Sequence, residues 1–420
     1  MKILFIFLLL LLSSISKATE KPNIVIILLD DAGYGDFHPF GTPPYPTPNV
    51  QELADQGARF NNFYVPQSSC SASRAALLTG SYPGRTRVFG AHAPNALGLP
   101  LKFPTLAEVL KEAGYSTAHF GKWHIGDRPE TRPLSRGFDE HAGLMYSNDM
   151  WRFHPVNPKK WGQFPLKFWE NGKVKIKDIS KKDQEQLTTW ATEKSVDFIK
   201  RNKNKPFFLY VAHSMPHVPL FCSKKFLGKS TVGLYGDVIM EIDWSVGQIH
   251  KAIKESGIER KTMIIFTSDN GPWTLYGNHG GQTPFRAAKG TSFDGGIKSP
   301  LIIKYPPLIK AGNVSNSTFF SIDLFPTITK LSGAKLPKSE IDGKDIAPLL
   351  SMKKSVVNPH KYYAITMNKN LEAVMSGDGR WKLHLPHKYR KVVLKGKDGS
   401  AGKYAHPKIN YSLYDLKNDP

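Results

Sequence analysis

Residues 23–29 read Asn-Ile-Val-Ile-Ile-Leu-Leu, and Asp30 and Asp31 follow them directly. The run has the length of a strand, is rich in β-branched residues and does not alternate between polar and apolar side chains. A strand with this pattern is buried on both faces, as the strands of parallel sheets are. The stretch therefore predicts a central strand of a parallel sheet, with two carboxylates at its carboxyl end.

Three later segments have the same pattern of a short apolar run that stops where polar residues begin. They are residues 115–120 before Gly121-Lys122-Trp123-His124, residues 207–212 before His213 and His217, and residues 263–267 before Ser268-Asp269-Asn270-Gly271. In open parallel sheets the ligand site lies outside the carboxyl ends of the strands. We therefore expect these polar residues to meet at one edge of the sheet.

Helical patterns lie between the predicted strands. Thr105 and Glu108 form a capping box, and Gly114 is a plausible stop for the helix that follows. Apolar residues recur at helical spacing over residues 238–253, before Gly257. Strands that alternate with helices indicate an α/β fold, in which helices flank a mainly parallel sheet.

The chain changes in texture at about Val356. Short segments rich in lysine, glycine and proline follow, which predicts a small antiparallel subdomain over residues 356–420 after a catalytic domain over residues 19–355. The chain ends at Pro420, just after a strand-like segment, so we expect a truncated subdomain.

The first 18 residues have the features of a signal peptide. Lys2 precedes an apolar run over residues 3–12, and small residues stand at Ser16 and Ala18. The run is shorter than the roughly 20 residues that a membrane-spanning helix needs. We expect an exported protein, periplasmic or secreted, with no membrane span once the signal peptide is removed.

The chain is strongly basic. Loss of Lys2 and Lys17 with the signal peptide leaves 55 Lys and Arg against 35 Asp and Glu, a net charge of +20. Such a balance favours anionic partners. The sequence has no zinc-finger spacing, RNP-like aromatic pattern or basic heptad helix, so nucleic acid is not expected.

Cys70 and Cys222 are the only cysteines. An exported protein that depended on disulfides would normally carry more, so stability is expected to come from a large core. Cys70 stands at the start of a predicted helix, a position that lowers the pKa of a thiol and makes it reactive.

Residues 70–80 read Cys-Ser-Ala-Ser-Arg-Ala-Ala-Leu-Leu-Thr-Gly. This stretch resembles the signature of the type I sulfatases, C-x-P/A-x-R followed by a short helix and T-G, and the resemblance extends from Pro22 to Asp419. It implies an alkaline-phosphatase-like α/β fold with a small C-terminal α+β subdomain. It also implies hydrolysis of sulfate monoesters, as in an arylsulfatase or a carbohydrate sulfatase. In that family the cysteine is oxidised to formylglycine, whose hydrate attacks sulfur and forms a covalent sulfo-enzyme intermediate.

The resemblance also assigns the rest of the site. The implied metal ligands are Asp30, Asp31, Cys70, Asp269 and Asn270. Once residue 70 is formylglycine the donors are all oxygens, which suits calcium, with magnesium as the nearest alternative. The implied catalytic residues besides Cys70 are Arg74, Lys122, His124, His217 and Lys289, and the implied substrate contact is Ser147. His217 is expected to protonate the departing alcohol, and His124 to remove a proton from the second hydroxyl of the hydrate.

Several questions stay open at this stage. Ala72 stands where many family members have proline, which leaves uncertain which formylglycine-generating enzyme converts Cys70. A phosphate or phosphonate monoester hydrolase on the same fold is the nearest rival, and an inactive binder of sulfated polysaccharide is the rival from another class. The expected substrate is a sulfated small molecule or a sulfated glycan. The tryptophans of residues 151–177 either stack on that substrate or pack an insertion; they are Trp151, Trp161 and Trp169.

Overall fold

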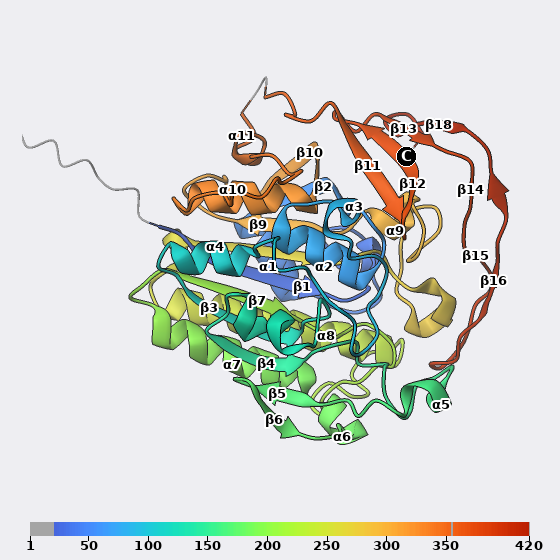
Figure 1. The fold of residues 1–420 in the computed structure, drawn as a ribbon, viewed down its shortest axis with the longest axis horizontal. Helices are drawn as coiled ribbons and strands as arrows, with labels where there is room; N and C mark the ends of the chain where they lie inside the picture. The colour runs from blue at the N-terminus through green and yellow to red at the C-terminus, as the bar shows by residue number, and fades with distance from the viewer. Residues whose placement is uncertain (1–20, 354–355, 420) are drawn as a thin grey trace, which may run out of the picture.

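The structure, a computed structural model, describes residues 21–353 and 356–419, so the predicted signal peptide lies outside it. A ten-stranded sheet in the order β10-β2-β9-β8-β1-β7-β3-β4-β5-β6 forms the centre (Figure 1). Its strands are β1 (Asn23–Leu29), β2 (Ala58–Tyr64), β3 (Ser116–Lys122), β4 (Glu140–Leu144), β5 (Phe168–Glu170), β6 (Lys173–Ile176), β7 (Phe207–Ala212), β8 (Thr262–Ser268), β9 (Leu301–Lys304) and β10 (Asn313–Phe320). The strands from β8 to β4 run parallel, and β9, β5 and β6 are antiparallel to their neighbours.

The four strands predicted from the sequence are adjacent in this sheet. β1 pairs with β7 on one side and β8 on the other, and Leu29 lies opposite Ser268 at the end of the ladder. On the far side of β7, Gly121 of β3 lies opposite Ala212. The carboxyl ends of the four strands therefore meet at one edge, as predicted. β3 extends through Lys122, two residues beyond the predicted end of that strand.

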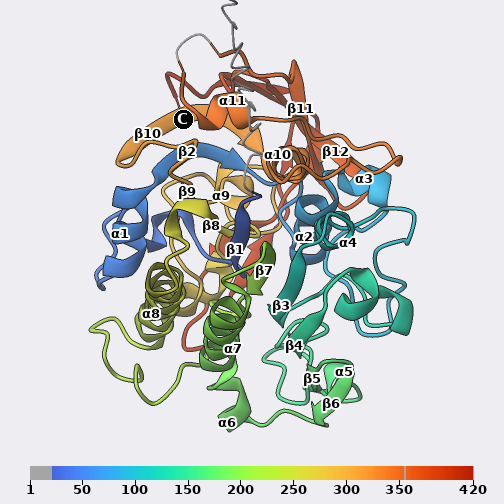
Figure 2. The same ribbon diagram turned by 90° about the vertical axis from the view of Figure 1, so that its left-hand side faces the viewer.

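Helices cover both faces of the sheet (Figure 2). Val25, Ile27 and Leu29 of β1 belong to a buried cluster with residues of α1 (Pro48–Gln56), α7 (Leu187–Asn202) and α8 (Leu234–Glu255). The alternate residues of β1 face the opposite cluster, with α2 (Cys70–Thr79), α4 (Leu106–Glu112) and α10 (Leu324–Leu331). Short helices complete the fold: α3 (Pro83–Thr86), α5 (Pro158–Trp161), α6 (Lys181–Gln184), α9 (Asp294–Ile297) and α11 (Ala347–Leu350).

Local sequence signals set the helix boundaries. At the start of α4, Thr105 Oγ1 accepts from Glu108 N at 3.2 Å, and Glu108 Oε2 accepts from Thr105 N at 2.6 Å. This reciprocal pair satisfies two backbone donors that the helix leaves free, which confirms the predicted capping box. The helix predicted over residues 238–253 is α8, which begins one turn earlier.

The C-terminal part is antiparallel, as predicted. Its main sheet has the order β11 (Tyr362–Met367), β12 (Asn370–Ser376), β13 (Trp381–His384) and β18 (Ser412–Asp415). Between β13 and β18 the chain forms a long excursion, residues 385–411, which we call the C-terminal arm. The arm contains the pairs β14 (His387–Lys388) with β17 (Lys408–Ile409) and β15 (Lys391–Leu394) with β16 (Lys403–Ala405).

The C-terminal arm runs from the small sheet past the carboxyl edge of the main sheet (Figure 1). Its tip is attached to the 3-10 helix η5 (Thr274–His279). Gly396 N donates to Leu275 O at 2.8 Å, and Asn278 Nδ2 donates to Asp398 Oδ1 at 2.9 Å. The arm is therefore fastened on the side of the sheet where the predicted site lies.

The three tryptophans of residues 151–177 have different surroundings. Trp151 is buried against Phe221, with ring centroids 5.9 Å apart, so it packs the core. The Trp169 ring lies under the Arg132 guanidinium, 4.4 Å away. Trp161 stacks on His154 with its ring partly accessible. The packing interpretation is right for Trp151.

Across residues 21–353 and 356–419, no helix has the length and apolar character needed to cross a membrane.

Candidate active site

Cys70 is the first residue of α2, beside the end of β1, and it is buried. Its Sγ donates to Asp30 Oδ1 at 3.3 Å and lies 3.4 Å from Lys289 Nζ. Burial and the carboxylate of Asp30 raise the pKa of the Cys70 thiol well above its ordinary value. The expectation of a lowered pKa was wrong, because burial and Asp30 outweigh the helix start and the nearby lysines. As an unmodified thiol, Cys70 is a weak nucleophile.

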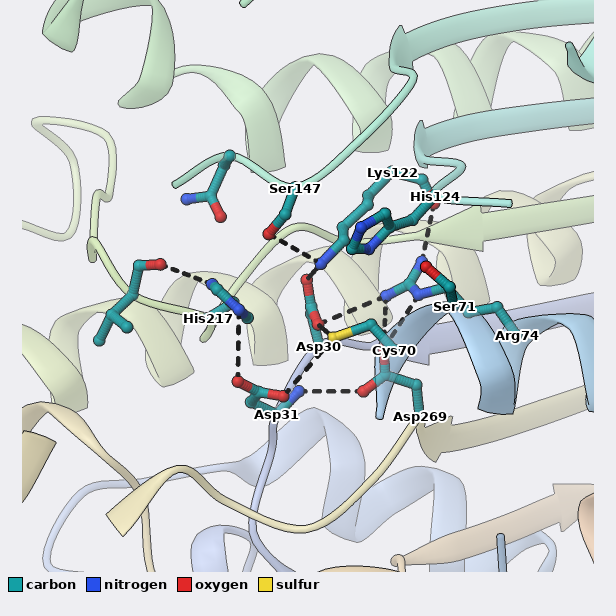
Figure 3. Close-up of polar contacts among 12 residues, drawn as sticks. Asp30, Asp31, Cys70, Ser71, Arg74, Lys122, His124, Ser147, His217 and Asp269 are labelled. Atoms are coloured by element: carbon teal, nitrogen blue, oxygen red, sulfur yellow. Dashed lines mark hydrogen bonds and ion pairs between the residues drawn. The ribbon is translucent and has the colours of Figure 1, made fainter. Parts of the chain in front are cut away.

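Asp30 and Asp31 continue β1 into the site. Asp31 has a φ of 64°, which turns the chain directly after the strand, and both carboxylates lie beside Cys70 (Figure 3). Asp30 forms an ion pair with Lys122, and Asp31 Oδ2 accepts from Lys289 Nζ at 2.6 Å. Burial alone would raise the pKa of Asp30, but Lys122 and the other cations of the site hold it well below its ordinary value.

Arg74 is one helical turn after Cys70, so the two side chains share a face of α2. Its Nε and Nη2 both lie 2.9 Å from Asp269 Oδ2, and its Nη1 donates to Lys122 O at 2.7 Å. Burial and the neighbouring Asp30 raise the pKa of Asp269 to about 7, although Arg74 lowers it. The guanidinium thus ties α2 to the ends of β3 and β8.

Lys122 ends β3 and reaches two partners, because its Nζ bonds to Asp30 and donates to Ser147 Oγ at 3.1 Å. His124 follows with a φ of 62°, and its Nε2 donates to His92 O at 3.0 Å. Within the described residues, His124 Nδ1 has no hydrogen-bond partner. Burial, with Lys122 and Arg74 nearby, lowers the pKa of His124 well below its ordinary value. The ring is therefore neutral, with a free lone pair at Nδ1.

His217 approaches from the loop after β7. Its Nδ1 donates to Val218 O at 2.5 Å, and its Nε2 lies 3.6 Å from Asp31 Oδ2 (Figure 3). Burial lowers the pKa of His217, and the positive charge of Lys289 adds to this effect. The hydrogen bond to Val218 O fixes the tautomer, so that Nε2 faces the site.

The donor atoms suit a hard divalent cation. Ligand atoms of Asp30, Asp31, Cys70 and His217 all lie within 4.8 Å of one another. Asn270 Nδ2 donates to Asp31 Oδ1 at 2.7 Å, while its buried Oδ1 has no hydrogen-bond partner in the described part of the chain. An unpartnered buried acceptor is costly unless a cation or a water satisfies it. The residues present therefore fit the expected metal.

Every predicted site residue lies at this edge of the sheet, but Asp269 differs from the other predicted metal ligands in its contacts. The carboxylate of Asp269 is not part of the tight group of four ligand atoms, because it bonds to Arg74 and accepts from Asp31 N at 3.2 Å. The three carboxylates face three cations, and a divalent ion would give the site a net positive charge. The carboxylates are Asp30, Asp31 and Asp269, and the cations are Arg74, Lys122 and Lys289.

Two residues that the sequence interpretation missed support the site. The Trp273 ring lies 5.3 Å from the His217 ring, and Lys289 Nζ lies 4.3 Å from the Trp273 centroid. Trp273 follows Asn270 closely at the end of a predicted strand, so its position was a usable signal. Trp273 Nε1 donates to Tyr404 Oη at 2.9 Å, but no local pattern marks Tyr404, which lies on the C-terminal arm.

Family models match this chain over most of its length. The model described as Sulfatase matches residues 22–334, a span that contains every predicted site residue. A second model, described as N-sulphoglucosamine sulphohydrolase, C-terminal, matches residues 287–384. The similarity therefore covers the main sheet and reaches into the C-terminal sheet.

Two relatives and a solved structure that resemble this chain are sulfatases. The chain is 37% identical over 390 residues to N-acetylgalactosamine-6-sulfatase of Rattus norvegicus, covering 88% of this chain and 72% of that protein. It is 38% identical over 363 residues to arylsulfatase A of Homo sapiens, covering 82% of this chain and 70% of that protein. The structure of the PsFucS1 sulfatase from Pseudoalteromonas sp. matches with a TM-score of 0.83 at 28% identity, covering 96% of this chain and 85% of that one.

Proposed function

The chain belongs to the sulfatase family and hydrolyses sulfate esters, and from that premise we propose that residue 70, converted from Cys70 to formylglycine, is its nucleophile. The observation that carries the proposal is the burial of Cys70 beside Asp30 and Lys289, in a setting that keeps an unmodified thiol protonated. The hydrate of the aldehyde supplies a hydroxyl that attacks sulfur, and a second hydroxyl through which the sulfate is released.

Three cations prepare the site for the charge of a sulfate ester. Arg74, Lys122 and Lys289 are each held by a carboxylate, so their positions are set before the substrate arrives. Fixed charges of this kind stabilise a transition state without reorganising during the reaction. Ser147 Oγ, which bonds to Lys122 Nζ, is placed to contact a sulfate oxygen.

We propose calcium as the bound ion, with magnesium as the nearest alternative. Asp30, Asp31, Asp269, Asn270 and residue 70 would hold it, and it would supply a further fixed positive charge at the ester oxygens. Asn270 Oδ1, which has no hydrogen-bond partner among the residues that the structure describes, supports this ligand set. Metal analysis of the native protein distinguishes the two ions.

Two histidines move the protons. His217 Nε2 gives a proton to the departing alcohol, and the negative charge of the bound ester raises the pKa of His217, which the free site lowers. His124 Nδ1, neutral and without a hydrogen-bond partner among residues 21–353 and 356–419, takes a proton from residue 70 when the sulfate is released.

The substrate is a sulfated glycan or an aryl sulfate. One relative is named for the 6-sulfate of N-acetylgalactosamine and another as an arylsulfatase, so both classes have support. The same proposal includes export of the mature chain to the periplasm or the medium. It also includes conversion of Cys70 by a formylglycine-generating enzyme that accepts Ala72. The proposed domains are a catalytic domain over residues 19–355 and a C-terminal subdomain over residues 356–420.

Mass spectrometry of the Cys70 peptide from natively produced protein tests the nucleophile. Conversion of CH2-SH to an aldehyde lowers the mass by about 18 Da. Cys70→Ala should abolish turnover of an aryl sulfate, and the converted protein should prefer aryl sulfate to the matched aryl phosphate. Faster turnover of the phosphate would support a phosphate monoesterase instead. An unmodified cysteine in active native protein would refute the proposed nucleophile.

A further inference from the structure

A cavity of about 310 Å³ lies between the segment around Lys289 and the C-terminal arm. Four of the described residues that line it are basic, and none of them is Asp or Glu. The lining residues are Thr274, Arg286, Ala287, Ala288 and Lys289 from the main domain, and Tyr389, Arg390, Lys391, Val392 and Tyr404 from the arm. The cavity has the charge and size for a small anionic group.

The cavity adjoins the nucleophile through Lys289. Lys289 lines the cavity wall, while its Nζ lies 2.6 Å from Asp31 Oδ2 and 3.4 Å from Cys70 Sγ. A sulfate that reacts at Cys70 and an anionic group in the cavity would therefore both lie next to Lys289. The charge of Lys289 itself is matched by Asp31.

Arg286 and Arg390, two further cations of the wall, have no carboxylate partner among the described residues. Arg286 donates to Tyr414 Oη at 2.8 Å and to Tyr389 Oη at 3.3 Å, and its guanidinium lies 4.1 Å from the Phe293 centroid. These partners are neutral hydroxyls and a ring. In the part of the chain that the structure describes, Arg286 forms no ion pair with a carboxylate.

Arg390 stands on the opposite wall, near the Tyr404 ring, with 5.6 Å between Cζ and the centroid. A Cβ added at Gly290 would come within 3.0 Å of Arg390 Nη1, so the guanidinium lies directly over the residue next to Lys289. Arg390 also has no carboxylate partner among residues 21–353 and 356–419. Two guanidinium groups without a carboxylate partner in the described part of the chain thus line one small cavity.

The arm holds this wall in place through a contact with the catalytic residues. Tyr404 Oη accepts from Trp273 Nε1 at 2.9 Å, and the Trp273 ring packs against His217. The tip of the arm is attached to η5 by Gly396 and Asp398. A bound anion would therefore meet guanidinium groups that the fold has already positioned.

We propose that this cavity, which we call the cationic subsite, binds a second anionic group of the substrate, a sulfate or a carboxylate. The inference rests on the proposed function, since it assumes that the first sulfate ester reacts at residue 70. Guanidinium groups bind such oxyanions through paired, charge-assisted hydrogen bonds. The preferred substrate is then a glycan with several anionic groups, rather than an ester that carries a single charge.

Calorimetric binding of sucrose octasulfate to the full-length protein tests the subsite. Arg390→Gln should weaken binding roughly tenfold, and the double variant Arg286→Gln/Arg390→Gln should weaken it further, because each substitution removes a charge-assisted contact. Lys403→Gln is the matched control: Lys403 is an exposed cation next to Tyr404 that does not line the cavity. The control should bind within about twofold of the wild type, since its charge is screened by solvent.

Two further measurements complete the test. The same calorimetric comparison of the wild type and the variants is repeated with trigalacturonate, which carries only carboxylates. Weaker binding by the Arg variants would show that the subsite accepts a carboxylate as well as a sulfate. Sucrose octasulfate should also compete with 4-nitrophenyl sulfate in the wild type, because the cavity adjoins Lys289. Equal affinities for the wild type, the double variant and the control, or binding without competition, would overturn the proposal. Absence of aryl sulfate turnover in converted wild type would instead count against the proposed function, and the binding comparison would still stand.

Discussion

Arg74 shows at the scale of one residue how the site depends on geometry and not only on charge. All three nitrogens of its guanidinium have a partner. Nε donates to Asp269 Oδ2, Nη1 donates to Lys122 O, and Nη2 forms an ion pair with Asp269. All of these groups are buried. The planar guanidinium of an arginine can contact Asp269 and Lys122 O at the same time, whereas the single ammonium of a lysine cannot.

Arg74→Lys should therefore lower kcat/KM for an aryl sulfate by about 100-fold or more, because Asp269 loses a partner and the end of β3 loses its tie to α2. Breaking a buried pair typically costs about 3–5 kcal/mol, so the variant should also unfold at a lower temperature. Steady-state kinetics and thermal unfolding measure the two effects. Arg85→Lys, at a partly buried pair with Asp342, is the control and should keep wild-type kinetics. Activity of Arg74→Lys close to that of the wild type would contradict this account.

At the scale of elements, the strands bring together residues whose protonation the sequence does not reveal. His119 of β3 and His141 of β4 are directly opposite in the ladder, with 2.9 Å between their Nδ1 atoms. Only one of the two nitrogens can carry the shared proton, so the pair must stay at least partly neutral. Burial lowers the pKa of His141 to about 3 and that of His119 well below its ordinary value.

A histidine whose pKa is lower in the folded protein costs stability as the pH falls. The unfolded chain binds the proton below about pH 6.5, and the folded chain does so only near pH 3 for His141. This one group should therefore reduce the free energy of unfolding by about 1.4 kcal/mol per pH unit over that window, an upper limit of roughly 5 kcal/mol. Denaturant unfolding at several pH values should show a shallower loss in His141→Gln than in the wild type. The exposed His406→Gln should retain the wild-type slope.

At the scale of the whole molecule, the C-terminal arm connects a late part of the chain to the edge of the sheet that carries the candidate active site. Tyr404 and Trp273 are far apart in sequence, and their hydrogen bond connects the arm to the ring that packs on His217. The arm is thus part of the site and not only of the small sheet.

Tyr404→Phe removes this hydrogen bond and leaves the ring in place. The lost bond is worth about 1 kcal/mol, so kcat/KM should fall roughly fivefold, with only a small change in the unfolding temperature. Kinetics with 4-nitrophenyl sulfate measure the effect. Tyr411→Phe is the matched control, because Tyr411 lies on the same arm and its side chain is exposed. An equal loss in both variants would show that the contact with Trp273 is not the cause.

The amino-acid sequence by itself determined four adjacent strands at the centre of the sheet and the edge at which the predicted site residues gather. Apolar runs such as residues 23–29 are local patterns, and parallel strands that pair in register must end at a common edge, so Asp30, Lys122, His217 and Asp269 had to meet there. The C-terminal strands were also predictable, because their composition changes abruptly after Val356.

The tertiary structure alone decided what the local patterns do not contain. The pKa of Cys70 follows from burial and from Asp30, 40 positions earlier, which outweigh the helix start that the sequence shows. The path of the arm places Arg390 and Tyr404 beside Lys289, and no periodicity or motif marks either residue. Desolvation and long-range contacts depend on every element that surrounds a group, so they exist only once the chain has folded.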